Sequence, residues 1–214
     1  MRIQKFTHAC IRVEDGDHAI AIDPGSFSEI AEAIEGVSAI LVTHEHADHI
    51  DVDAVTKALA ADSSLRLFAP GPVASQFASD QAAAVEPGQS FDAGGFAVST
   101  HGGQHAVIHP LIPMCANVGF RLAAGGTAVY HPGDSFAVPD QPVSTLLLPT
   151  SGPWMKMSEA IDFLIAVRAP HAVQVHDALL SEFGRGFVEA QVSSLGGRYG
   201  VRFEHLDVRA TAEV

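Results

Sequence analysis

Three histidines and one aspartate fall within six consecutive residues, in the spacing His-x-His-x-Asp-His. They are His44, His46, Asp48 and His49, directly after the apolar run 39–42. Side chains two positions apart in an extended segment project to the same side, so His44 and His46 can bind one metal ion. Asp48 and His49 suit the first turn of a helix, from which they can reach a second ion. A strand before the motif and a helical pattern after it favour a metal centre over a polar loop.

Two metal ions need more than four protein ligands, and further candidates follow other apolar runs. Each begins a loop after an expected strand: His101, His105 and His109 after 96–100, Asp134 after 128–130, and His176 after 173–175. The register from the turn at 94–95 favours His105 among the three histidines. The recurrence of metal-ligand side chains at strand ends supports a dinuclear centre.

Short strands and helices alternate around these residues. Hydrophobic patterning predicts strands at 3–6, 10–13, 19–22, 39–42, 65–69, 96–100, 118–122, 128–130, 145–148 and 172–175, with a hairpin turn at 14–17. It predicts helices at 28–34, 51–60, from the turn at 70–72 through 77, at 158–168 with Ser158 as the cap, and from 178 onward. Two mixed sheets covered by helices fit this order of elements.

The composition is typical of a compact protein without nucleic-acid or membrane contacts. With 214 residues, 47% hydrophobic and 17% charged, we expect one domain over 1–214. No apolar run is long enough to span a bilayer, the N-terminus has no hydrophobic signal stretch, and two cysteines are too few for a disulfide framework. A cytoplasmic location is therefore expected. The net charge of −13 disfavours nucleic acid as a partner.

The chain resembles the metallo-β-lactamase-fold superfamily of metal-dependent hydrolases. The residues that match the motifs of that family are His44, His46, Asp48, His49, His105, Asp134 and His176. The segments Thr7-His8-Ala9-Cys10, Ile22-Asp23-Pro24-Gly25 and Tyr130-His131-Pro132-Gly133-Asp134 are most similar to a small branch that includes ascorbate-6-phosphate lactonase-like proteins.

This resemblance implies an α+β fold, a four-layer αββα sandwich with the metals at one edge. It further implies one metal site made of His44, His46 and His105, a second made of Asp48, His49 and His176, and a bridge from Asp134. Neutral imidazoles and carboxylates suit zinc, and manganese, iron or nickel would accept the same set. Two such ions can share a hydroxide that acts as the nucleophile. The expected substrate is a small-molecule ester, lactone or phosphorylated metabolite.

Several other residues have two open interpretations. His8 and His131 join Asp48 and Asp134 as candidate catalytic residues, although His131 can also be a plain strand-end histidine. Asp23 either caps a turn or orients a metal-bound histidine. His101 and His109 are expected near the metals or on the surface rather than as ligands. Trp154 and Lys156 lie in a loop that either lines the pocket or covers the core.

Three alternative functions remain open. The same fold could serve a phosphodiesterase or nuclease, against which the acidic charge argues. A redox enzyme with two irons is less favoured, since di-iron members of the superfamily carry a carboxylate where this chain has His46. A metal-binding protein without turnover is the third, and the complete set of ligands argues against it. A homo-oligomer is compatible with every reading.

Overall fold

The computed structural model describes residues 1–78 and 80–214, which form two seven-stranded sheets. The first sheet contains, in spatial order, β14 (Thr211–Glu213), β1 (Arg2–Lys5), β2 (Ile11–Asp15), β3 (His18–Ile22), β4 (Ala39–Leu41), β5 (Arg66–Ala69) and β6 (Ala82–Ala84). The second contains β13 (Arg202–Glu204), β12 (His171–Val175), β11 (Thr145–Pro149), β10 (Thr127–His131), β9 (Val118–Ala124), β8 (Phe96–Gly102) and β7 (Ser90–Ala93).

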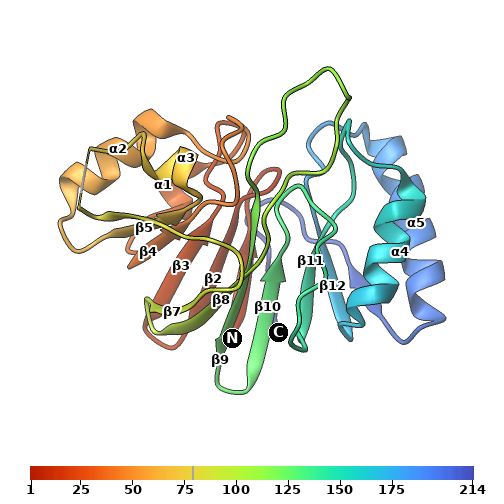
Figure 1. The fold of residues 1–214 in the computed structure, drawn as a ribbon. Coiled ribbons are helices and arrows are strands. Elements are labelled where there is room, and N and C mark those ends of the chain that lie inside the picture. The colour runs from red at the N-terminus through yellow and green to blue at the C-terminus, as the bar shows by residue number, and fades with distance from the viewer. Residues whose placement is uncertain (79) are drawn as a thin grey trace.

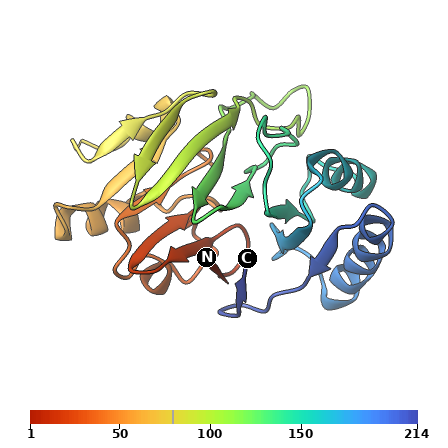
Figure 2. The ribbon, with the colours of Figure 1, turned by 90° about the horizontal axis from the view of Figure 1, so that it is seen from below.

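Five helices lie on the outer faces of the two sheets (Figure 1). They are α1 (Ile30–Ala33), α2 (Val52–Ala61) and α3 (Gly71–Ala74) beside the first sheet, and α4 (Met157–Val167) and α5 (Glu182–Gly197) beside the second. Seen from below, the sheets stack between these two groups of helices (Figure 2). The expected αββα sandwich is therefore confirmed.

Strand periodicity explains why the sheets are covered on both faces. In β3, Ile20 and Ile22 point into the core between the sheets, whereas Ala19 and Ala21 pack toward the helices outside. In β11, Leu147 enters the central core, and its neighbours Leu146 and Leu148 meet the outer helices. Such strands are buried on both sides, which is why they read as continuous apolar runs.

The pairing of strands changes from antiparallel to parallel within each sheet. β1, β2 and β3 are antiparallel, and β3 to β6 are parallel. In the second sheet β7 to β10 are antiparallel and β10 to β13 parallel. Parallel neighbours need crossover connections. Helix α2 joins β4 to β5 and α4 joins β11 to β12, whereas residues 132–144 join β10 to β11 without a helix.

Several predicted boundaries were wrong. Asp48 and His49 lie in a turn before α2, which begins at Val52 with Asp51 accepting a hydrogen bond from Ala54 N. Because Asp51 caps the helix, the motif stays outside it. The last helix begins at Glu182 rather than at 178, with Ser181 as its cap.

Other helix ends and one turn also differ. The cap of α4 is Lys156, so Ser158 lies inside that helix. The observed α1 and α3 are shorter than the predicted helices, and the first hairpin turn is confined to Gly16 and Asp17, since Asp15 pairs with His18. The positive φ of Gly16 (58°) explains the tightness of this turn.

Both cysteines in the described residues are free thiols. Cys10 is buried and Cys115 is half-buried, and burial raises the pKa of their thiols to about 12 and about 11. No helix among the described residues is long and apolar enough to cross a bilayer.

Candidate metal centre

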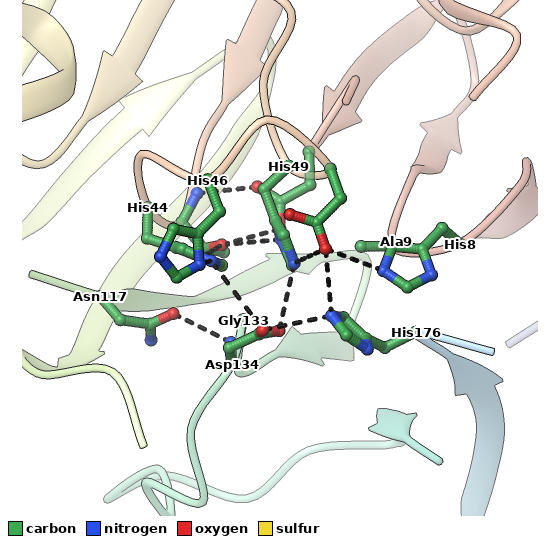
Figure 3. Close-up of polar contacts among 12 residues, drawn as sticks. His8, Ala9, His44, His46, His49, Asn117, Gly133, Asp134 and His176 are labelled. Carbon is green, nitrogen blue, oxygen red and sulfur yellow. Dashed lines mark hydrogen bonds and ion pairs between the residues drawn. The ribbon is translucent and has the colours of Figure 1, made fainter. Parts of the chain in front are cut away.

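All seven candidate ligands lie in loops that follow strand ends, and these loops meet at one edge of the sandwich. The residues and preceding strands are His44, His46, Asp48 and His49 after β4, His105 after β8, Asp134 after β10 and His176 after β12. Figure 3 shows His49 and His176 pointing toward Asp134, with His44 and His46 beside them. The convergence predicted from the sequence is thus present in the structure.

The ligand atoms fall into two groups, and within each group all of them lie within 4.8 Å of one another. The first group is His44, His46, His105 and Asp134, and the second is His8, Asp48, His49 and His176. The two sets expected from the family resemblance are contained in these groups, and His8 is an addition to the second.

Asp134 lies between the two groups. Its Oδ2 is 3.3 Å from His105 Nε2 in the first group and 3.1 Å from His176 Nε2 in the second. Its Oδ1 is 3.1 Å from His49 Nε2. A carboxylate in this place can contact two ions at once, as the predicted bridge requires.

Four buried polar atoms at the centre make no hydrogen bond of good geometry among the described residues, although the three nitrogens lie 3.1 to 3.3 Å from the Asp134 carboxylate. They are His49 Nε2, His105 Nε2, His176 Nε2 and Asp134 Oδ1. Buried polar atoms are nearly always paired, because leaving one unpaired costs about 1 to 3 kcal/mol. Their shared direction and their N and O chemistry fit divalent metal ions.

Three of the histidines are hydrogen-bonded through Nδ1, on the side of the ring that faces away from the centre. The Nδ1 atoms of His49, His105 and His176 each face an oxygen acceptor and so carry the ring hydrogen. The acceptors are, in the same order, Asp23 Oδ2 at 2.7 Å, Ala106 O at 2.5 Å and Ser151 O at 2.5 Å. With Nδ1 held in this way, Nε2 is the nitrogen of each ring that faces the centre and that a metal ion would use. His46 presents Nδ1 instead, 3.0 Å from His44 Nε2.

Asp23 performs the orienting role that the sequence left open. It is fully buried, its Oδ1 accepts a hydrogen bond from Thr43 N at 2.7 Å, and its Oδ2 accepts one from Thr43 Oγ1 at 2.7 Å. The same Oδ2 accepts the Nδ1 hydrogen of His49. Its φ of 51° is unusual for a residue with a side chain. Such strain persists where the surroundings fix it, as at a functional site.

Charge around the centre is balanced between carboxylates and histidines. Burial alone would raise the pKa of Asp134, but His49, His105 and His176 hold that pKa well below its usual range. Burial alone would lower the pKa of His176, but Asp134 and Asp48 raise it to about 9. The metal-free centre therefore holds protons where divalent cations would otherwise sit.

His8 differs from the other histidines of its group. Its Nδ1 accepts a hydrogen bond from Ala178 N at 3.3 Å, so the ring hydrogen is on Nε2. That Nε2 lies 3.1 Å from Asp48 Oδ2 and donates to it. His8 thus has the pattern of a hydrogen-bond donor at the centre rather than that of a ligand.

The remaining histidines lie outside the two groups. His131 is buried, its Nε2 donates to Ala9 O at 2.9 Å, and its Nδ1 accepts from Gly133 N at 3.0 Å. Both ring nitrogens face the backbone, so the geometry favours a positioning role over the proposed catalytic one. His101 contacts Ser99, and His109 is an exposed loop residue.

Trp154 packs against the centre, whereas Lys156 does not contact it. The indole ring centroid lies 5.9 Å from that of His105 and 5.8 Å from that of His176, and the residue is 6% exposed. Lys156 is exposed and its backbone N–H is bound to Glu159 at the start of α4.

Two supports of the site escaped the sequence analysis. Asn117 is buried, accepts a hydrogen bond from Asp134 N at 2.9 Å and donates one to Pro132 O at 2.9 Å. Gly25 lies so close to the motif that a Cβ there would be 1.9 Å from Asp48 O. The turn that contains Gly25 was the available signal for that residue, whereas the apolar segment 111–118 gave none for Asn117.

Comparison with known proteins identifies the family. The model of the beta-lactamase superfamily domain matches residues 2–176. The chain therefore belongs to the metallo-β-lactamase superfamily, as the motif resemblance implied.

Among relatives, "Protein Rv0786c" of Mycobacterium tuberculosis is 36% identical over 91% of this chain and 92% of its own length. A protein of Xanthobacter autotrophicus named UPF0173 metal-dependent hydrolase is 33% identical over 63% of this chain and 62% of its own. Igni18, described as a novel metallo hydrolase of Ignicoccus hospitalis, has the same fold, with a TM-score of 0.75 and 19% identity over 100% of this chain and 98% of its own.

Proposed function

We propose that this metal-dependent hydrolase holds two divalent ions, zinc foremost, and hydrolyses a small-molecule ester, lactone or phosphorylated metabolite. The observation that carries the proposal is the convergence of four buried ligand atoms, on His49, His105, His176 and Asp134, that make no hydrogen bond of good geometry. Atoms of this kind are retained where a bound cation satisfies them.

Two ligand sets follow from the geometry. His44, His46 and His105 would hold the first ion, and Asp48, His49 and His176 the second. Asp134 would contact both. The two sets supply five histidine nitrogens and the carboxylates of Asp48 and Asp134. Zinc is favoured because imidazole and carboxylate are common zinc ligands, while manganese, iron or nickel would accept the same set.

The bound ions would supply Lewis acidity and lower the pKa of a water molecule. The protein's own residues orient the side chains that would bind the ions. Asp23, Ala106 O and Ser151 O fix the histidine tautomers, and His8 donates its Nε2 hydrogen to Asp48. That hydrogen is also in place to be donated to a developing negative charge on the substrate. His131 holds the backbone at Ala9 and Gly133 in place.

The resemblance to ascorbate-6-phosphate lactonase-like proteins supports a lactone as one possible substrate. The other functions that the sequence left open receive less support. The net charge of −13 argues against a nuclease, and the complete ligand set argues against a protein that binds metal without turnover. A di-iron hydroxylase, CmlA of Streptomyces venezuelae, shares the fold with a TM-score of 0.75 but only 14% identity, over 100% of this chain and 54% of its own. His46 stands where the redox members carry a carboxylate.

Elemental analysis combined with a hydrolysis screen tests the proposal. The purified protein should contain close to two divalent ions per chain and should hydrolyse members of a panel of esters, lactones and phosphodiesters. A chelator should abolish turnover and lower the melting temperature, because ions bound only by the folded state stabilise it. Reconstitution that never exceeds one ion per chain would refute the dinuclear centre.

A further inference from the structure

Apolar side chains gather around the metal centre where a substrate must enter. Those exposed on the surrounding loops, with their exposed fractions, are Phe27 (47%), Val107 (58%), Leu111 (86%), Ile112 (46%), Met114 (41%) and Leu179 (62%). Four of them belong to the loop between β8 and β9, which also carries His105 and rises above the edge of the sandwich (Figure 1). A cluster of exposed apolar residues beside a polar centre is typical of a binding surface.

The loop between β8 and β9 forms one wall directly beside the first ligand group. Ile112 and Met114 line a small cavity together with His46 and His105. Its volume of about 10 Å³ is too small for a hydrocarbon chain, so such a chain would lie over it, against the exposed parts of Ile112 and Met114.

The opposite sides of the centre are also apolar. Trp154 lies against His105 and His176, with Phe136 behind it at a ring-centroid distance of 5.2 Å. Phe27 packs edge-on against His8 at 5.3 Å. The donor hydrogen of His8 therefore sits beside an apolar surface.

Cationic residues are nearly missing from these loops. The loops 6–10, 23–29, 43–50, 103–117, 132–137, 150–156 and 176–181 contain a single Lys or Arg between them, Lys156. Glu45 is exposed in the metal-binding motif itself. Lys5 is buried just below the site, but its ammonium group is paired with Asp177. An anionic group of a substrate that lies away from the metal ions is most often bound by Arg or Lys, and this entrance does not offer a cluster of them.

We infer that the substrate is a neutral, apolar acyl compound, an ester or lactone whose hydrocarbon part lies against Ile112, Met114 and Trp154. This inference rests on the proposed hydrolase function and excludes the phosphorylated metabolite from it. In the reaction, water adds to the acyl carbon, the acyl C–O bond breaks, and the leaving oxygen takes a proton to give an alcohol and a carboxylic acid.

Turnover of matched esters tests the substrate class. The zinc-loaded protein is assayed with p-nitrophenyl acetate, p-nitrophenyl octanoate and the mono-p-nitrophenyl ester of suberic acid, which has the length of octanoate and a terminal carboxylate. We expect kcat/KM to rise with chain length, by up to about fourfold for each methylene that the wall covers. We expect octanoate to exceed the suberate ester at least about tenfold. Equal or better turnover of the suberate ester would overturn the inference.

A double variant locates the wall. Ile112→Ser with Met114→Ser should lower the ratio of kcat/KM for octanoate to that for acetate at least about tenfold. Val208→Ser is the matched control, because Val208 is 42% exposed but lies between β13 and β14, and it should change neither value. An unchanged octanoate-to-acetate ratio in the double variant would contradict the inference. So would a dimer in size-exclusion chromatography that this variant dissociates, because the loop would then be an interface between copies.

Binding without turnover separates this inference from the proposed function. Trp154 is the single tryptophan of the chain, so its fluorescence reports on this entrance alone. A titration with 2-decanone, a neutral ketone that cannot be hydrolysed, should change the emission at much lower concentrations than 2-butanone does. If 2-decanone binds tightly and no ester is hydrolysed, the hydrolase function fails and the apolar site stands. If esters are hydrolysed but the two ketones bind equally, the apolar site fails alone.

Discussion

The ammonium group of Lys5 lies 3.0 Å from Asp177 Oδ1, in an ion pair where Lys5 is 1% and Asp177 8% exposed. Lys5 Nζ also donates to Phe6 O at 3.0 Å and to His8 O at 3.4 Å. His176 N donates to the same carbonyl of His8 at 3.1 Å. The pair therefore joins the loop that carries His8 to the loop that carries His176, and both histidines have positive φ, 67° and 58°.

Lys5→Met should destabilise the fold strongly, because it leaves the Asp177 carboxylate buried without a counter-charge. Removing one partner of a buried ion pair typically costs about 3 to 5 kcal/mol. Urea unfolding of the metal-loaded protein measures the loss. Arg209→Met is the control, since the ion pair of Arg209 with Glu32 is exposed on both sides, and it should cost far less.

The charge explanation can be separated from loss of packing. Lys5→Met combined with Asp177→Leu removes both charges and should recover much of the stability. If the double variant is as unstable as Lys5→Met alone, packing around the Lys5 side chain matters and the charge does not.

His105 should be essential for the first metal ion, unlike its two neighbours in sequence. His105 Nε2 faces Asp134 Oδ2, whereas His101 and His109 lie outside both ligand groups. His105→Ala should therefore reduce the metal content to about one ion per chain. His101→Ala and His109→Ala should lose at most about tenfold in affinity, measured by competition with a chromogenic chelator. Loss of the metal in His109→Ala with retention in His105→Ala would disprove the assignment.

Metal binding should release protons near neutral pH. In the metal-free protein the carboxylates around His176 raise its pKa to about 9, and the pKa of His49 is well above its ordinary value for the same reason. Both histidines must lose a proton to bind a cation, so apparent affinity should rise with pH until about pH 9. Calorimetric titration of zinc at pH 7.5, in buffers of different ionisation enthalpy, should show roughly one to two protons released per chain. Release of none would show that both histidines are neutral before binding.

The same shift predicts how the metal-free fold responds to pH. Because the folded-state pKa of His176 is raised, its protonated form stabilises the fold fully below its unfolded pKa of about 6.5. That contribution is lost as the pH rises from about 6.5 through about 9. The melting temperature of the chelator-treated protein should therefore decrease as the pH rises through this range, while that of the metal-loaded protein should not.

The sequence predicted the central strands far better than the edges of the sheets. Strands such as β3 and β11 are buried on both faces, so their apolar runs are unmistakable. The short strands β6, β7, β13 and β14 were not predicted. β6 is Ala82–Ala84, a sequence with no strand preference, and it forms because the edge of β5 is available for pairing. Such pairing depends on distant residues that local patterning does not show.

The candidate metal ligands could be found in the sequence for a reason that does not apply to the residues that support them. His and Asp residues at strand ends can be recognised as candidate ligands from residue type and position alone. Lys5 and Asn117 cannot be recognised in this way. Lys5 matters because it is buried beside Asp177, 172 positions away, and Asn117 because it is buried beside Asp134, 17 positions away. The role of Asp23 was undecided until the distance to His49 was known. Only the packed fold reveals which polar residues lie behind the ligands.

Asp134→Asn provides the sharpest test of the centre. Asp134 is 3% exposed and its two oxygens reach His105 in the first group and His49 and His176 in the second. Asn keeps the size of the side chain but removes the charge and one good oxygen ligand. We expect weaker binding of at least one ion and a loss of about a hundredfold or more in turnover, as for the removal of several kcal/mol of metal-assisted catalysis.

The fold should survive this change, because the backbone of Asp134 is held independently. Its N–H donates to Asn117 Oδ1 at 2.9 Å, and its carbonyl accepts from Ala106 N at 2.8 Å. Circular dichroism should therefore match the parent protein, and the metal content and turnover should fall together. A variant that keeps both ions and near-normal turnover would show that Asp134 only shapes the turn and that another group bridges the ions. Asn117→Ala is the complementary variant. It removes the hydrogen bond that holds the backbone of Asp134 and leaves the charge of the Asp134 side chain in place.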